Sequence, residues 1–69
     1  MSWHTLNPNI RDTAETVLTT KQLAVFQDRL NGHSWRTIAN AYHINEATAR
    51  GHHQRALERI AQALKKDTT

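Results

Sequence analysis

The sequence predicts an all-α fold: a small helical domain of four helices with a helix-turn-helix and a long C-terminal recognition helix. Apolar residues recur at three- and four-residue spacing along most of the chain, as on the buried side of helices. Residues that cap helices stand in front of these segments, and only two Gly and one Pro interrupt them. We expect a single domain, in which residues 1–17 form an N-terminal arm and short helix and residues 18–66 form the helix-turn-helix part.

The N-terminal segment gives the weakest pattern. Residues 1–9 show no periodicity and are expected to form an extended arm, pinned by Trp3. Asn9 is expected to cap a short helix from residue 10 to about residue 18. Its inner side would carry Ile10, Ala14, Val17 and Leu18.

The next helix has the clearest start. Thr19 and Gln22 have the spacing of a capping box, in which each side chain satisfies a free backbone N–H of the other. Leu18 and Leu23 have the spacing of the accompanying hydrophobic staple. Phe26 and Leu30 continue the apolar side, and Asn31-Gly32 is expected to end the helix.

Two further helices follow, separated by a three-residue turn. Ser34 is expected to cap a helix that ends near Tyr42, and His43 takes the turn position that requires a positive φ. Asn45 is expected to cap one long helix from residue 46 to about residue 65. Its inward face is predicted to comprise Ala49, Ala56, Leu57, Ile60, Ala63 and Leu64.

The positive charge lies in the second half of the chain. Residues 1–32 hold three basic and three acidic side chains, whereas residues 33–69 hold six basic and three acidic ones, which accounts for the whole net charge of +3. This distribution favours a polyanionic partner such as nucleic acid. A solvated surface with a mild basic excess is the alternative.

Several classes of function are disfavoured. The chain has no Cys, which excludes disulfides and thiol chemistry, and no apolar run suggests a signal peptide or a membrane contact. We therefore expect a cytoplasmic, nucleoid-associated protein. His52 and His53 point about 100° apart on a helix and lack partners at ligand spacing, so neither a metal nor another cofactor is expected. No nucleophile or phosphate-loop signature is present, which argues against an enzyme.

A known pattern matches residues 18–64 without a gap. Its positions are Leu18-Thr19, Val25-Phe26, Gly32, Ser34, Ile38-Ala39, Ile44-Asn45, Thr48-Ala49-Arg50 and Arg55-Ala56-Leu57. The chain resembles the DNA-binding region four of bacterial sigma factors and the related LuxR-type domains, and its single long final helix is more like the sigma region. The resemblance implies that this helix lies in the major groove of DNA. The base-facing residues would be Glu46, Ala47, Thr48, Arg50, Gly51 and Gln54.

The chain departs from the sigma pattern at three positions. Ala47 and Gly51 stand where sigma factors usually carry long polar or basic residues, and His52 stands at a usually apolar position. These departures indicate a different DNA target. No polymerase-binding region accompanies the match, so we do not expect the chain to act as a sigma factor by itself.

Each base-facing residue has a functional and a structural interpretation. Arg50 could read guanine O6 and N7, or pair with Glu46 four residues earlier. Glu46 could accept from cytosine N4, or simply favour the helix dipole. Thr48 could contact a thymine methyl or a phosphate, or bond to local backbone. Ala47 and Gly51 would let the helix approach the bases closely.

Phosphate contacts are expected around this face. The candidates are Arg36, Arg55, the backbone N–H groups of Ser34 and Trp35, and the side chains of His52 and His53. If a histidine contacts phosphate, binding should tighten as the pH falls through about 6.5.

The leading hypothesis is sequence-specific binding of double-stranded DNA by a small transcriptional regulator encoded by a phage or mobile element. The alternatives are a sigma-region mimic that binds RNA polymerase or a sigma factor, and a DNA packaging or recombination accessory protein. A homodimer through Trp3, Ile60 and Leu64 would double the DNA contact. Alternatively, the N-terminal helix could cover Ile60 and Leu64 within one chain.

Overall fold

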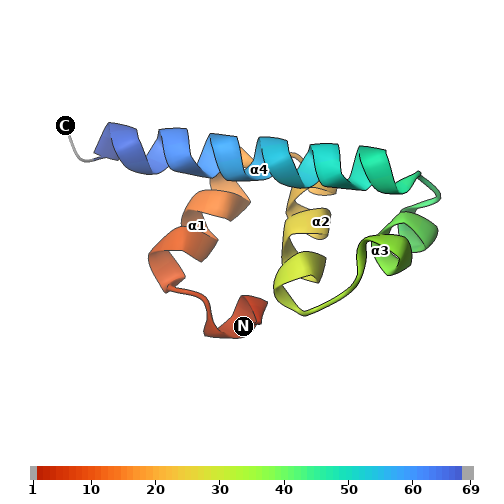
Figure 1. Cartoon of the computed structure of the whole chain (residues 1–69). Helices are drawn as coiled ribbons and strands as arrows, with labels where there is room; N and C mark the ends of the chain where they lie inside the picture. The colour runs from red at the N-terminus through yellow and green to blue at the C-terminus, as the bar shows by residue number, and fades with distance from the viewer. Residues whose placement is uncertain (1, 68–69) are drawn as a thin grey trace.

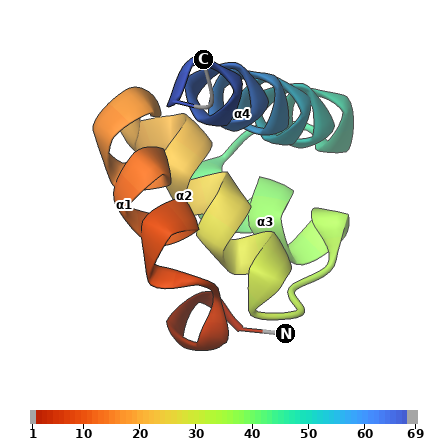
Figure 2. The same ribbon diagram turned by 90° about the vertical axis from the view of Figure 1, so that its left-hand side faces the viewer.

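In a computed structural model of the chain, which describes residues 2–67, three helices pack side by side against a fourth (Figure 1). A 3-10 turn, η1 (Trp3–Thr5), precedes α1 (Pro8–Val17), α2 (Thr20–Leu30), α3 (Trp35–Tyr42) and α4 (Glu46–Asp67). Figure 2, seen along α4, shows α1, α2 and α3 on one side of that helix. The described residues form no strand, so the all-α prediction is confirmed.

The predicted starts of α2, α3 and α4 are confirmed. The Gln22 backbone N–H donates to Thr19 Oγ1 at 3.3 Å, and the Thr19 N–H donates to Gln22 Oε1 at 3.2 Å. Ser34 Oγ accepts from the Thr37 N–H at 3.1 Å, and Asn45 Oδ1 accepts from the Thr48 N–H at 2.7 Å. Each cap satisfies a backbone donor that the first turn of a helix leaves unpaired.

The predicted N-terminus is wrong in two respects. The first α-helix begins at Pro8 and is capped by Asn7, whose Oδ1 accepts from the Asn9 N–H at 2.8 Å. Proline suits the first helical position, because its φ is fixed near the helical value and it has no N–H to leave unpaired. Residues 3–5 are not extended but form η1. Trp3 is buried there, and its backbone N–H donates to Asn31 Oδ1 at 3.0 Å.

The two turns that flank α3 use the left-handed backbone that the sequence indicated. Gly32 has a φ of +91° just after α2, and His43 has a φ of +56° just after α3. The Ile44 N–H donates back to the Ala39 carbonyl at 3.0 Å, which closes the end of α3. The three-residue turn between α3 and α4 is therefore confirmed.

The core consists of two clusters. The larger cluster joins η1, α1, α2 and α4, and its buried residues are Trp3, Ala14, Leu18, Phe26, Ala56 and Ile60. The smaller cluster joins α2, α3 and α4, and its buried residues are Val25, Ile38 and Ala49. Trp3 is 9% exposed and Ile60 is 6% exposed, so the predicted dimer face through these residues is wrong. The alternative is confirmed, since α1 covers Ile60 and packs beside Leu64 within one chain.

One residue of the predicted inward face of α4 points outward. Leu57 is 43% exposed, whereas Ala49, Ala56 and Ile60 are buried. Leu57 points about 100° away from Ala56, and the neighbouring helices cover the side of Ala56 but not that of Leu57. Although α4 spans 22 residues, neither it nor any other helix of the described residues has the length and apolar character needed to cross a membrane.

Candidate nucleic-acid interface

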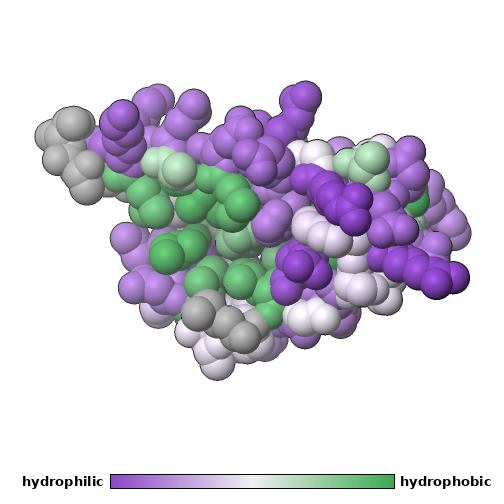
Figure 3. All heavy atoms as spheres, in the orientation of Figure 1, coloured by the Kyte–Doolittle hydropathy of each residue, from purple (hydrophilic) through white to green (hydrophobic). Residues whose placement is uncertain are grey.

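The first three turns of α4 present a polar, open surface. The exposed residues there include Glu46, Ala47, Thr48, Arg50, Gly51 and Gln54. These are the six predicted base-facing residues, and the structure brings them together on one end of the molecule. The end that holds α3 and the start of α4 is largely polar in Figure 3, whereas apolar residues gather at the opposite end.

This surface is held against the body by small apolar contacts. Ala49 is fully buried between α2 and α3, beside Val25 and Ile38. Partly buried Trp35, Tyr42 and Ile44 surround that contact. The turn and both helices around it, residues 35–55, therefore form one packed unit, which we call the α3–α4 unit.

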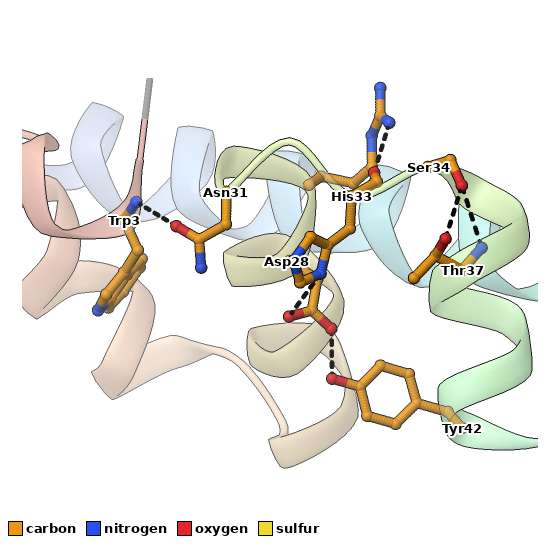
Figure 4. Close-up of polar contacts among 8 residues, drawn as sticks. Trp3, Asp28, Asn31, His33, Ser34, Thr37 and Tyr42 are labelled. Atoms are coloured by element: carbon orange, nitrogen blue, oxygen red, sulfur yellow. Dashed lines mark hydrogen bonds and ion pairs between the residues drawn. The ribbon is translucent and has the colours of Figure 1, made fainter.

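A polar clamp fixes the end of α3 to α2. The Tyr42 hydroxyl donates to Asp28 Oδ2 at 2.5 Å, and the other oxygen of Asp28 lies 3.6 Å from His33 Nδ1 (Figure 4). The hydrogen bond to Asp28, burial and the carboxylate charge together raise the pKa of Tyr42 to about 12. This clamp gives no signal in the sequence, because Asp28 and Tyr42 lie 14 positions apart on different helices.

Arg50 forms the structural contact, the pair with Glu46, that was one of the two interpretations the sequence left open. Its Nη2 lies 3.6 Å from Glu46 Oε1, so the pair within the helix is formed. Its guanidinium carbon also lies 5.8 Å from the centre of the Trp35 ring. Its side chain remains 57% exposed, so these contacts restrain the guanidinium without removing it from solvent. An exposed pair of this kind contributes about 0.3–0.5 kcal/mol, which a stronger ligand contact can replace.

Trp35 is the centre of a larger cluster that the sequence did not indicate. The Arg29 guanidinium carbon lies 4.3 Å from the Trp35 ring centre, and Arg29 Nη1 donates to the His33 carbonyl at 2.9 Å. Two arginines from different helices thus lie beside one indole ring. Arg29 adds a positive group to the start of α3, where Ser34 and Arg36 are exposed.

The two adjacent histidines differ in their surroundings. The His53 ring lies between aromatic rings, 5.3 Å from that of Trp35 and 6.2 Å from that of Phe26. Burial and the nearby Arg29 charge lower the pKa of His53, so it is neutral at pH 7. His52 instead lines the outer groove described next. Both histidines were predicted to contact phosphate, but only His52 lies beside the other predicted DNA-facing residues that line the groove.

A shallow groove runs along the side of α4 opposite Trp35. It is lined by Thr19, Gln22, Thr48, Gly51, His52 and Arg55. The start of α2 thus forms one wall, which the sequence analysis did not foresee. A Cβ atom built on Gly51 would meet no atom within 4 Å, so the fold itself does not require glycine there. The groove has basic and hydroxyl groups on its walls and open space at its centre.

No described group of three or more His, Asp or Glu side chains is arranged to hold a metal ion. No protein-family model, no curated protein and no solved structure matches this chain.

Proposed function

We propose that the protein binds double-stranded DNA sequence-specifically, with the α3–α4 unit acting as a helix-turn-helix and the first turns of α4 entering the major groove. In this proposal it acts as a small transcriptional regulator. The resemblance of residues 18–64 to sigma region four and LuxR-type domains supports it, as does the basic surplus in residues 33–69.

The observation that carries the proposal is Gly51. A glycine inside a helix costs about 0.5–1 kcal/mol relative to alanine, so it needs a compensating role. Gly51 is exposed and has open space around it, so no contact inside the protein supplies that role. The close approach of an external surface would supply that role. The neighbouring Ala47 and Arg50 fit a helix that lies against base edges.

Arg50 is the base-reading residue in this proposal. Glu46 and Trp35 hold its guanidinium near the helix while leaving it accessible. A bidentate contact to guanine O6 and N7 contributes about 1–3 kcal/mol of discrimination against other bases. In this proposal Arg36, His52 and Arg55 contact phosphates on either side of the helix.

The first test is selection from a random duplex library at physiological salt, followed by sequencing of the retained DNA. The proposal expects an enriched motif that contains a guanine. Arg50→Ala should abolish the preference for that guanine. The difference in binding free energy between the motif and its guanine-substituted form, about 1–3 kcal/mol for the wild type, should then disappear. Arg59→Ala removes the same charge from an exposed position further along α4, and it should weaken all sequences alike. Retention that depends on salt but enriches no motif would contradict the proposal.

Gly51→Ala provides an independent test of the interface. The free protein should gain about 0.5–1 kcal/mol in its free energy of unfolding, because the helix improves and the methyl group meets nothing. Its affinity for the selected DNA should nevertheless fall. Unchanged affinity in the more stable variant would show that no ligand approaches Gly51.

The alternative is a sigma-region mimic that binds RNA polymerase or a sigma factor. Ala47 and Gly51 make the exposed start of α4 less polar than a base-reading helix usually is, which leaves room for a protein partner. This alternative expects Arg50→Ala to retain partner binding, whereas the DNA proposal expects the selected motif to be lost.

A further inference from the structure

Three nitrogen-bearing side chains surround the ring of Trp35. The guanidinium carbon of Arg29 lies 4.3 Å from the ring centre, and that of Arg50 lies 5.8 Å from it. The His53 ring meets the Trp35 ring edge to face, with the two ring centres 5.3 Å apart. Because the arginines come from α2 and α4, the fold gathers two permanent positive charges on one half-buried indole, beside the proposed DNA-facing surface.

The two arginines differ in how their charges are balanced. Arg50 is paired with Glu46, whose Oε1 lies 3.6 Å from Arg50 Nη2. Arg29 has no carboxylate at ion-pair distance among the residues that the structure describes. The carboxylate of its neighbour Asp28 instead accepts the hydrogen bond of the Tyr42 hydroxyl. The charge of Arg29 is therefore one that an anion from outside the chain can balance.

Arg29 is held in place without being neutralised. Its Nη1 donates to the carbonyl of His33 at 2.9 Å, and a carbonyl is an uncharged acceptor. The Trp35 ring contacts the guanidinium through the face of that group, whereas all guanidinium N–H donors lie in the plane and point outward. The outward fork of a guanidinium matches two oxygens of a phosphate group. The supports of Arg29 thus orient the group and leave part of its edge for such a ligand.

We propose that Arg29 binds a phosphate group, with Trp35 and the His33 carbonyl as its supports. Under the proposed function, on which this choice of source rests, the phosphate belongs to the DNA backbone next to the guanine that Arg50 reads. Arg50 and Arg55 point about 140° apart on α4, at about 100° per residue. The groove that holds Arg55 therefore lies on the other flank of the helix, and Arg29 supplies a backbone contact on the Trp35 flank.

The first test uses inorganic phosphate and the full chain without DNA. In NMR spectra of the ¹⁵N-labelled protein, the side-chain N–H signals of Arg29 and Trp35 should shift and saturate with millimolar phosphate, but not with chloride at equal ionic strength. Arg29→Gln should abolish the shift of the Trp35 signal. Arg59→Gln removes the same charge from an exposed position further along α4 and should retain that shift. Circular dichroism of each variant checks that the helices are retained.

The second test uses the duplex motif obtained by selection. Its phosphates are replaced one at a time by uncharged methylphosphonates, and one replacement beside the guanine should weaken wild-type binding about tenfold, as expected for the loss of one charged hydrogen bond. Arg29→Gln should weaken binding by a similar factor. The same methylphosphonate should then have no further effect, because both changes remove one contact. Arg59→Gln should leave the effect of that methylphosphonate unchanged.

The outcomes separate this site from the proposed function. Coupling of Arg29 to one phosphate of the duplex would support the DNA backbone as the source, whether or not the free ion binds. A phosphate-specific shift without such coupling would support the site with free phosphate as its ligand, and the further absence of a selected motif would contradict the proposed function. A selected motif with neither coupling nor shift would overturn the role of Arg29 and leave the proposed function standing. The absence of motif and shift alike would overturn both.

Discussion

The two core clusters hold their helices by different means. The larger cluster buries two aromatic rings, those of Trp3 and Phe26, which meet edge to face with their centres 6.1 Å apart. The smaller cluster under α3 has just three buried side chains, none of them aromatic. Polar and cationic contacts supplement it, namely Tyr42 on Asp28 and Arg29 on Trp35. The end that carries the proposed DNA surface is therefore held by a small apolar cluster together with directional contacts, and the opposite end mainly by apolar burial.

The difference has a consequence for function. Apolar burial stabilises a fold over a wide range of pH, because it involves no charge. Directional contacts orient side chains such as Arg50, but they depend on protonation and on each partner. Local opening is thus expected first in α3, where fewer apolar contacts exist.

The largest expected effect separates the clusters by stability. Phe26→Ala should lower the free energy of unfolding by about 3–5 kcal/mol, since it leaves a cavity where α1, α2 and α4 meet. Urea denaturation followed by circular dichroism measures this loss, and we expect a chain of this length to be largely unfolded by it. Ile38→Val, in the smaller cluster, should cost about 0.5–1.5 kcal/mol. A loss from Ile38→Val, which deletes one methyl group, as large as that from Phe26→Ala would contradict the greater contribution of the larger cluster.

The clamp on α3 should give the next largest effect. Tyr42→Phe removes the hydrogen bond to Asp28 and should cost about 1–2 kcal/mol near pH 7. The pKa of Tyr42 is raised to about 12 in the folded chain, so the unfolded state loses its proton first. The stability from this contact is therefore present below about pH 10 and is lost as the pH rises towards 12. Denaturation of both proteins between pH 8 and 11 measures it, and parallel curves would contradict the role of the clamp.

The Trp35 ring should have a smaller effect, on specificity rather than on folding. Trp35→Phe keeps a ring beside Arg29 and Arg50, whereas Trp35→Leu keeps apolar bulk without a ring face. A cation beside an exposed ring gains about 0.5–1 kcal/mol, so the leucine variant should lose about two- to fivefold in guanine preference. Binding of both variants to the selected motif and to its guanine-substituted form provides the comparison. Identical preferences would leave Trp35 with a packing role alone.

The smallest effect concerns His53. Its pKa is lowered by burial and by Arg29, so the unfolded chain takes up a proton at a higher pH than the folded chain does. The stability from neutral His53 is present above about pH 6.5 and declines as the pH falls through the lower folded value. His53→Gln should make the free energy of unfolding less dependent on pH between 7 and 5. A wild-type curve that is already flat in this range would refute the effect.

The sequence by itself determined the helices and most of their boundaries. Thr19, Ser34 and Asn45 act on backbone groups within three residues, and Gly32 and His43 set the backbone at their own positions. Such local chemistry can be read without knowledge of the fold. The start of α1 was the exception, because Asn7 and Asn9 both stand where a cap is plausible and Pro8 decides between them.

Only the tertiary structure decided which side chains meet. Arg29, Trp35 and His53 come from three helices, and the groove at Gly51 takes one wall from the start of α2. The exposure of Leu57 was equally out of reach, because the spacing of apolar residues marks a helix side but not the width that its neighbours cover. Local rules act through neighbours in sequence, whereas burial and charge pairing depend on the packing of helices that lie far apart along the chain.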